Sequence, residues 1–164
     1  MAVRPIIRFP DPRLRVAAEP VTRFDTDLRT LAADLLDTMR AAPGLGITAP
    51  HIGLALRLVV LELEPGQVGF YVNPEVVEAS SDTIRQTEGS VSMPGVVEEI
   101  ERPARVTIRY RDLDGAEHIE PAEGFRSVCH QHEIDQLDGI FWIDRLSRLK
   151  RDRVIARYNK LRRG

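Results

Sequence analysis

Hydrophobic residues in the first quarter of the chain recur at the spacing of one helix face. Over residues 27–40 the apolar positions lie mostly three or four residues apart, as expected for an amphipathic helix. These positions are Leu28, Leu31, Ala32, Leu35, Leu36 and Met39. Thr22–Asp27 offers capping residues before them, and Ala42-Pro43-Gly44 breaks the pattern after them. The pattern predicts a helix over residues 27–40.

The middle of the chain changes to short β-branched and aliphatic runs, which favour strands. The predicted strands are Arg57–Glu64, Val68–Asn73, Val96–Ile100, Val106–Arg111 and Glu117–Pro121. Glu75–Arg85 alternates only loosely, and turn residues interrupt the pattern over Glu88–Gly95. Asp112–Gly115 is typical of a hairpin turn. Residues 44–53 form a glycine-studded loop, where small residues let the backbone approach another group closely.

Helical periodicity returns in the last quarter of the chain. One helix is predicted over Glu123–Leu137, and a second follows within residues 144–164. A helix, then antiparallel strands, then helices is the order of an α+β fold. The length of 164 residues, without a repeat or a linker, predicts a single domain over residues 1–164.

Composition excludes several classes of protein. The longest apolar run, around Leu58–Leu63, has the length of a strand, so we expect no membrane-spanning segment. The start of the chain lacks the apolar region of a signal peptide, and its one cysteine cannot form an internal disulfide. We therefore expect a cytoplasmic protein that binds neither membrane nor DNA.

Charge is divided unevenly between the body of the chain and its end. Residues 144–164 hold nine Lys and Arg against two Asp and Glu, a net charge of +7, whereas the remaining residues sum to −9. A basic helix on an acidic body is a candidate docking element for an anionic surface. The alternative is a solvated helix whose basic residues sit favourably towards its C-terminal end.

The clearest chemical signal lies in the helix predicted over Glu123–Leu137. His132, Glu133 and Gln136 follow the spacing of H-E-x-x-H, the zinc-protease motif, with Gln136 in place of the second histidine. Residues four apart share a helix face, so His132 and Gln136 are expected to point the same way. His130 is expected to point away from that face.

Three motifs stand in order along the chain. They are Gly44-Leu45-Gly46-Ile47-Thr48-Ala49-Pro50-His51, Glu88-Gly89-Ser90-Val91-Ser92 and His132-Glu133-Ile134-Asp135-Gln136. The chain resembles peptide deformylases, which carry G-x-G-x-A-A-x-Q, E-G-C-L-S and H-E-x-D-H in this order. The resemblance runs nearly end to end. It implies antiparallel β-sheets packed around a central motif-bearing helix, with helices near both ends of the chain.

The resemblance also implies a reaction, the hydrolysis of the N-formyl group of N-formylmethionyl peptides. In that family one Cys and two His hold a divalent metal: iron(II), zinc or nickel. By resemblance, His132 keeps a metal-ligand position, Glu133 keeps the proton-moving carboxylate, and the Val91 backbone N–H keeps an oxyanion position. Framework or substrate-binding positions are kept by Gly44, Leu45, Gly46, Glu88 and Cys129.

Three positions depart from the family pattern. Ser90 stands at the Cys ligand, Gln136 at the second His ligand and His51 at the oxyanion Gln. A Ser hydroxyl and a neutral Gln carbonyl are poor ligands for iron or zinc, and a water without a metal keeps its pKa of ~16. We therefore expect weak or no divalent-metal binding and a deformylase activity that is lost or much reduced. The groove inherited from the family would still bind a peptide N-terminus.

Three alternatives stay open. A rearranged metal site on His51 and His132, with Glu133 as base, would make an active N-acyl or formyl hydrolase. Ser90 as nucleophile, a His as base and Glu133 or Asp135 as orienting group would follow triad logic, although Ser90 lacks the G-x-S-x-G context. The third is a non-catalytic protein that docks on the ribosome or a nascent chain through its basic C-terminal helix, which the family resemblance associates with the ribosome.

Overall fold

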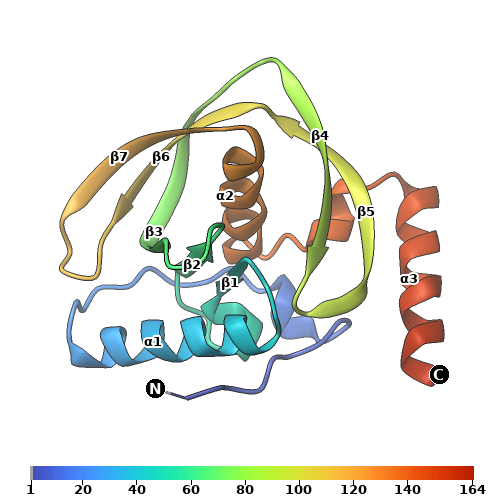
Figure 1. Ribbon diagram of the computed structural model, residues 1–164, viewed down its shortest axis with the longest axis horizontal. Helices are drawn as coiled ribbons and strands as arrows, with labels where there is room; N and C mark the ends of the chain where they lie inside the picture. The colour runs from blue at the N-terminus through green and yellow to red at the C-terminus, as the bar shows by residue number, and fades with distance from the viewer. Residues whose placement is uncertain (1) are drawn as a thin grey trace.

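The computed structural model describes residues 2–164, and its elements follow the order expected for an α+β fold (Figure 1). α1 spans Thr26–Ala41 and confirms the helix predicted from the apolar period. Asp25 caps its N-terminus, because the Asp25 side chain accepts a hydrogen bond of 3.1 Å from the Leu28 backbone N–H. Leu35 and Met39 are fully buried in the core that α1 shares with the larger sheet.

The strands form two antiparallel sheets. The larger sheet has the strand order β1-β2-β3-β6-β7, and the smaller one pairs β4 with β5. The strands are β1 (Gly46–Thr48), β2 (Leu58–Glu62), β3 (Val68–Ala79), β4 (Thr83–Ser90), β5 (Met93–Pro103), β6 (Arg105–Arg111) and β7 (Glu117–Glu123). The α+β class and the antiparallel sheets predicted from the sequence are confirmed.

The predicted end of a strand at Asn73 is wrong, because β3 continues to Ala79. Asn73 has a φ of 51°, and the pairing of β3 with β6 shifts register between Val72 and Glu75. The Asn73 side chain exchanges hydrogen bonds of 2.8 and 2.9 Å with the Val21 backbone. The strand therefore passes through a bulge that a distant segment holds in place.

Two other strand boundaries also differ from the prediction. The turn expected over Glu88–Gly95 is confined to Val91 and Ser92, since β4 and β5 pair on either side of it. β1 lies inside the expected glycine-rich loop, where it pairs with β2 in antiparallel register. Both corrections bring motif residues onto strands, which hold side chains more rigidly than loops do.

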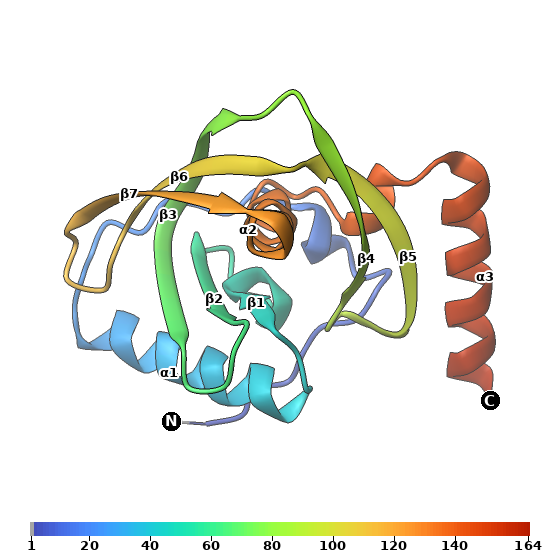
Figure 2. The same ribbon diagram turned by 45° about the horizontal axis from the view of Figure 1, so that its top comes forward.

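The motif-bearing helix α2 spans Gly124–Leu137 and lies between the two sheets (Figures 1 and 2). It is preceded by β7 and ends before Gly139, whose φ of 77° suits a glycine at a helix end. Several of its polar side chains are buried: Ser127, His130, Gln131, Glu133, Asp135 and Gln136. Because buried polar groups need partners inside the protein, the environment of α2 has to be polar in places.

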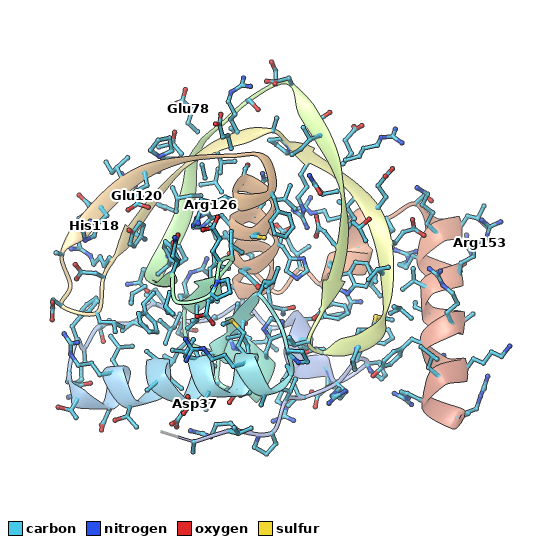
Figure 3. The ribbon with its side chains drawn as sticks, in the orientation of Figure 1. Asp37, Glu78, His118, Glu120, Arg126 and Arg153 are labelled. Atoms are coloured by element: carbon cyan, nitrogen blue, oxygen red, sulfur yellow. The ribbon has the colours of Figure 1, made fainter. Side chains whose placement is uncertain are left out.

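α3 spans Arg148–Arg163 and packs against β5 on the outside of the smaller sheet (Figure 2). Val154 and Tyr158 are its buried residues, and they join a core that also contains Phe141 and Trp142. Arg153 projects from α3 away from the sheets (Figure 3). Across residues 2–164, no helix combines the length and the apolar character that a bilayer crossing requires.

Candidate functional site

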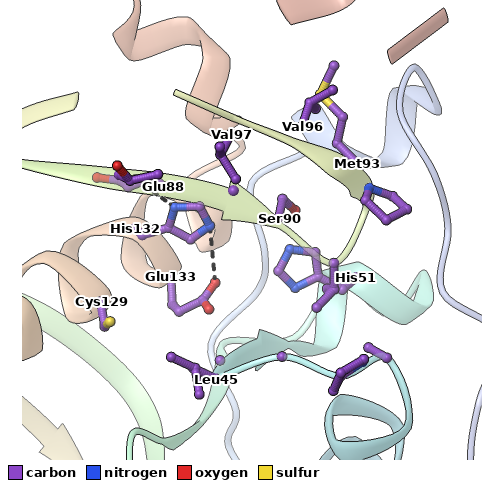
Figure 4. Close-up of a pocket in the computed structure, with 18 of the residues that line it drawn as sticks. Leu45, His51, Glu88, Ser90, Met93, Val96, Val97, Cys129, His132 and Glu133 are labelled. Carbon is purple, nitrogen blue, oxygen red and sulfur yellow. Dashed lines mark hydrogen bonds and ion pairs between the residues drawn. The ribbon is translucent and has the colours of Figure 1, made fainter. Parts of the chain in front are cut away.

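A cavity of about 480 Å³ lies where α2 meets β1 and the turn between β4 and β5 (Figure 4). Residues of all three sequence motifs line it, from Gly44–Gly46 and His51 through Glu88–Val91 to His132 and Glu133. Its volume falls within the range of small-molecule sites in proteins, about 300–1,000 Å³. The cavity is therefore the candidate site.

His132 is oriented by the carboxylate of Glu88. His132 Nδ1 lies 2.8 Å from Glu88 Oε1, and Glu88 also accepts hydrogen bonds of 2.5 and 2.9 Å from Arg102. Burial alone would raise the pKa of Glu88, but the hydrogen bonds from His132 and Arg102 hold it below its ordinary value. Burial likewise disfavours a charged His132, yet Glu133 and Glu88 together raise the pKa of the imidazole.

Glu133 holds a carboxylate deep in the cavity with few partners. Its Oε1 lies 3.9 Å from His132 Nε2, drawn as a dashed line in Figure 4, and accepts no hydrogen bond from the described part of the chain. Burial raises the pKa of Glu133 to about 6, against the lowering effect of His132. A Cβ at Gly46 would overlap Glu133 Oε2, so the glycine makes room for this carboxylate.

His51 presents a fixed hydrogen-bond donor. The Thr48 backbone N–H donates to His51 Nδ1 over 2.9 Å, so the neutral ring carries its proton on Nε2. Burial, together with the nearby His132, lowers the pKa of His51 to about 3, so the ring is neutral near pH 7. His51 Nε2 is buried and has no hydrogen-bond partner within residues 2–164.

Ser90 and Val91 lie where β4 turns into β5, with Ser90 beside His51 in Figure 4. Ser90 Oγ accepts a hydrogen bond of 3.1 Å from the Ser92 backbone N–H, which stabilises the turn. In the described structure no histidine hydrogen-bonds to Ser90 Oγ. The base that a serine nucleophile requires is therefore not in contact with it.

Gln136 is turned away from the cavity. Its Nε2 donates a hydrogen bond of 2.7 Å to the Leu14 carbonyl, and the residue is 2% exposed. His132 and Gln136 are four residues apart on α2, but their surroundings differ, since His132 lines the cavity and Gln136 does not. His130 packs edge-on against Tyr71, with ring centroids 4.8 Å apart, and points away from the cavity as predicted.

Known proteins match this chain over nearly its whole length. The sequence profile described as Polypeptide deformylase matches residues 3–152. A protein named Peptide deformylase-like from Brucella suis is 65% identical, over 99% of this chain and 100% of its own. A Peptide deformylase from Phenylobacterium zucineum is 45% identical, over 98% of this chain and 97% of its own. The chain belongs to the peptide deformylase family.

Solved structures of peptide deformylases have the same fold. The crystal structure of a peptide deformylase from Legionella pneumophila gives a TM-score of 0.94 at 38% identity, covering 99% of this chain and 96% of that chain. The peptide deformylase from Ehrlichia chaffeensis in complex with actinonin gives a TM-score of 0.92 at 35% identity, covering 100% of both chains. The family and the fold predicted from the three motifs are confirmed.

The donors in this cavity do not fit the metal ligands that the family resemblance implies. Ser90 offers a hydroxyl in place of a thiolate, and the Gln136 amide is bonded to Leu14. Within residues 2–164, no cluster of three or more His, Cys, Asp or Glu side chains is arranged to hold a metal ion. Cys129 also lines the cavity, and burial raises the pKa of its thiol to about 12, so this thiol is neutral near pH 7.

The residues assigned to substrate binding by resemblance all line the cavity: Gly44, Leu45, Gly46, Glu88 and Cys129. Their individual roles stay predictions. Glu88 is committed to His132 and Arg102, so it orients other groups and has little capacity left for a ligand. Leu45 is exposed and lines the cavity, as do Val97 and Phe125, two exposed apolar residues that sequence reasoning missed.

Sequence reasoning also missed Arg102, which links two of the motifs. Its guanidinium donates to Glu88 on β4 and, over 2.8 Å, to Asp135 on α2. Arg145 binds the same Asp135 carboxylate with bonds of 2.8 and 2.9 Å, so two guanidinium groups anchor Asp135 and with it α2. Glu88 and Asp135 are acidic residues within two of the motifs. Their presence was the signal that a buried cation would balance their charges.

Proposed function

We propose that this member of the peptide deformylase family binds the N-terminus of an N-formyl or N-acyl peptide and has little or no metal-dependent deformylase activity. The observation that carries the proposal is the hydrogen bond from Gln136 Nε2 to the Leu14 carbonyl, which ties the amide at one family ligand position to the backbone of a residue outside the cavity lining. Ser90 occupies the second ligand position. His132 is then the one residue of the family ligand set that remains.

Two buried atoms without partners support a ligand-binding role. His51 Nε2–H is a donor and Glu133 Oε1 is an acceptor, and both lie in residues that line the cavity. Buried polar groups in proteins are nearly always hydrogen-bonded, so both atoms call for a bound group. A secondary amide satisfies both, because its oxygen accepts from His51 while its N–H donates to Glu133. The N-formyl or N-acyl amide of a peptide has this composition.

The cavity also has an apolar rim that suits the first side chain of such a peptide. Leu45, Val97 and Phe125 are among the large hydrophobic residues of the chain that stay exposed, and all three line the cavity. Exposed apolar groups gathered at a cavity favour an apolar ligand group, because its binding removes both surfaces from water. A methionine side chain fits this requirement.

Peptide binding without metal is the first test. A formyl-Met-Ala-Ser peptide should bind the full-length protein in EDTA, measured by isothermal titration calorimetry. L45A should weaken binding roughly fivefold, because it removes apolar contact area at the rim. L149A is the matched control, since Leu149 is equally apolar and 62% exposed on α3, away from the cavity. Its affinity should equal that of the wild type.

Activity measurements decide between this proposal and the hydrolase alternative. With iron(II), nickel or zinc supplied, the wild-type protein should release formate from the same peptide no faster than the E133A variant. Turnover that depends on both an added metal and Glu133 would establish the metal-dependent hydrolase alternative instead. Absence of peptide binding in EDTA would contradict the binding role.

A second candidate function is docking on the ribosome through α3. α3 holds eight Lys and Arg against one Asp, and Arg148, Arg153 and Arg163 are exposed without an ion pair in the described structure. Exposed arginines without ion pairs support attraction of α3 to an anionic surface. The cytoplasmic location is part of the same proposal.

Charge variants test this docking better than truncation, because Val154 and Tyr158 of α3 belong to the core. R148Q/R153Q/R163Q should lower co-sedimentation with ribosomes severalfold, and R23Q/R29Q/R85Q, with the same loss of charge elsewhere, should not. Equal loss in both triple variants would mean that net charge alone, and not α3, drives the association.

A further inference from the structure

Arg8 lies at the cavity and gives it a cationic group that no sequence motif contains. We propose that the cavity takes a short N-acylated ligand with a free carboxylate, an N-acyl amino acid or N-acyl dipeptide, and that Arg8 binds this carboxylate. The inference rests on the proposed function, since it assumes that the acyl amide is bound by His51 and Glu133. The inference restricts the ligand from any peptide N-terminus to a short N-acylated molecule with a free carboxylate.

The N-terminal segment places Arg8 through two backbone hydrogen bonds. The Ile7 N–H donates to the His51 carbonyl over 2.9 Å, and the Phe9 N–H donates to the Ser92 carbonyl over 2.8 Å. The side chains of Ile7 and Phe9 pack on the core beneath β5. Successive side chains of an extended segment point to opposite sides, and the alternate residues Ile6 and Arg8 accordingly line the cavity.

The charges around the cavity leave Arg8 available for an anion. Arg8 is the single Lys or Arg among the described residues that line it, and it takes part in no ion pair within residues 2–164. Glu88 is already balanced by Arg102 and His132. An incoming carboxylate therefore meets a free guanidinium, which binds carboxylates through two parallel N–H donors.

The backbone positions of Arg8 and His51 favour a short ligand. Because Ile7 is hydrogen-bonded to the His51 backbone, Arg8 is one residue away from the segment that carries the imidazole. An extended residue spans about 3.3–3.6 Å, so one or two residues bridge from an amide at His51 to a carboxylate near Arg8. A longer chain would carry its carboxylate out of reach of Arg8.

The test compares two ligands that differ only in their C-terminal group. N-formyl-Met-Ala with a free carboxylate should bind the full-length protein in EDTA roughly tenfold more tightly than its C-terminal amide, as measured by calorimetry. R8Q should bind both ligands with the affinity that the wild type has for the amide. R8K should restore part of the preference, since it keeps the charge but not the paired donors.

R23Q is the matched control, because Arg23 is also exposed and lies outside the cavity lining. It should keep the full preference for the free acid, and added salt should reduce that preference in both R23Q and the wild type. Equal affinity of the wild type for acid and amide would overturn the role of Arg8 while leaving the proposed function standing. Failure of both ligands to bind would overturn the proposed function and this inference together.

Discussion

The S90C/Q136H variant should bind close to one zinc, nickel or iron(II) ion per chain, under conditions in which the wild-type protein binds none tightly. The variant returns a thiolate and an imidazole to the two positions at which the chain departs from the family ligands. A bound metal lowers the pKa of a thiol, so a cysteine at position 90 would ionise where the Ser90 hydroxyl does not. Metal analysis of purified protein by mass spectrometry measures the outcome.

The free-energy terms favour metal binding in this variant. Replacing Gln136 sacrifices its hydrogen bond to Leu14, which is worth about 1 kcal/mol net. Closed sites of thiolates and imidazoles bind zinc with an apparent free energy of about 10–16 kcal/mol in small zinc domains. A site with half that free energy would still outweigh the lost bond. In the Q136H background the histidine side chain can therefore point towards the cavity, instead of towards Leu14, once a metal is present.

Control variants separate a restored site from adventitious binding. S90C and Q136H alone should each bind metal far more weakly than the double variant, because each supplies one ligand beside His132. S81C/Q136H adds the same two side chains but places the thiol at the exposed Ser81, outside the cavity lining. A folded S90C/Q136H protein that binds no more metal than S81C/Q136H would show that residues 90 and 136 do not flank a common metal position.

The parts of the molecule that follow from local pattern could be predicted from the sequence. α1 follows from apolar residues on one face, and the family resemblance of the three motifs, not local pattern, indicated that they share a common site. The continuation of β3 past Asn73 could not be seen, because Asn73 and its neighbours are held by the Val21 backbone, 52 residues away. The predicted strand therefore ended at Asn73, before the loosely alternating residues Glu75–Arg85.

Many of the residues that line the candidate site could be predicted from the sequence, but the hydrogen bonds between them could not. Helical spacing placed Gln136 with His132, but a hydrogen bond to Leu14, 122 residues away, decides where its amide points. The protonation of His51 depends on the Thr48 N–H, a detail of a short 3-10 turn over Ala49–Ile52. Such contacts depend on tertiary packing, which periodicity does not encode.

Replacing Arg102 should cause the largest loss of stability among single changes near the site. Arg102 is 4% exposed and binds both Glu88 and Asp135, so R102M leaves two carboxylates in the interior without their shared cation. Removing one partner of a buried ion pair costs about 3–5 kcal/mol. For a chain of this size the midpoint of thermal unfolding should fall by roughly 10 °C. Differential scanning calorimetry measures the change.

R105M is the matched control for R102M, since Arg105 and its partner Asp82 are both 56% exposed in their side chains. Surface ion pairs contribute about 0–1 kcal/mol, so R105M should lower the midpoint by only a degree or two. Equal losses in the two variants would contradict the assignment of Arg102 as the buried balancing charge.

The pH dependence supplies a second readout for the role of Arg102. The pKa of Glu88 is lowered in the folded wild-type protein, so its contribution to stability is present above the ordinary carboxyl pKa and is lost as the pH falls through the lowered value. Without Arg102 this carboxylate keeps only His132 to favour its charged form, so its pKa rises. The loss of unfolding free energy in R102M relative to the wild type should therefore be largest near pH 7 and shrink below about pH 4, where carboxyl groups take up protons.

E88Q/R102M should recover part of the loss at pH 7, because it removes one uncompensated charge with the cation. A deficit that is the same at both pH values would mean that Arg102 stabilises the fold by packing alone.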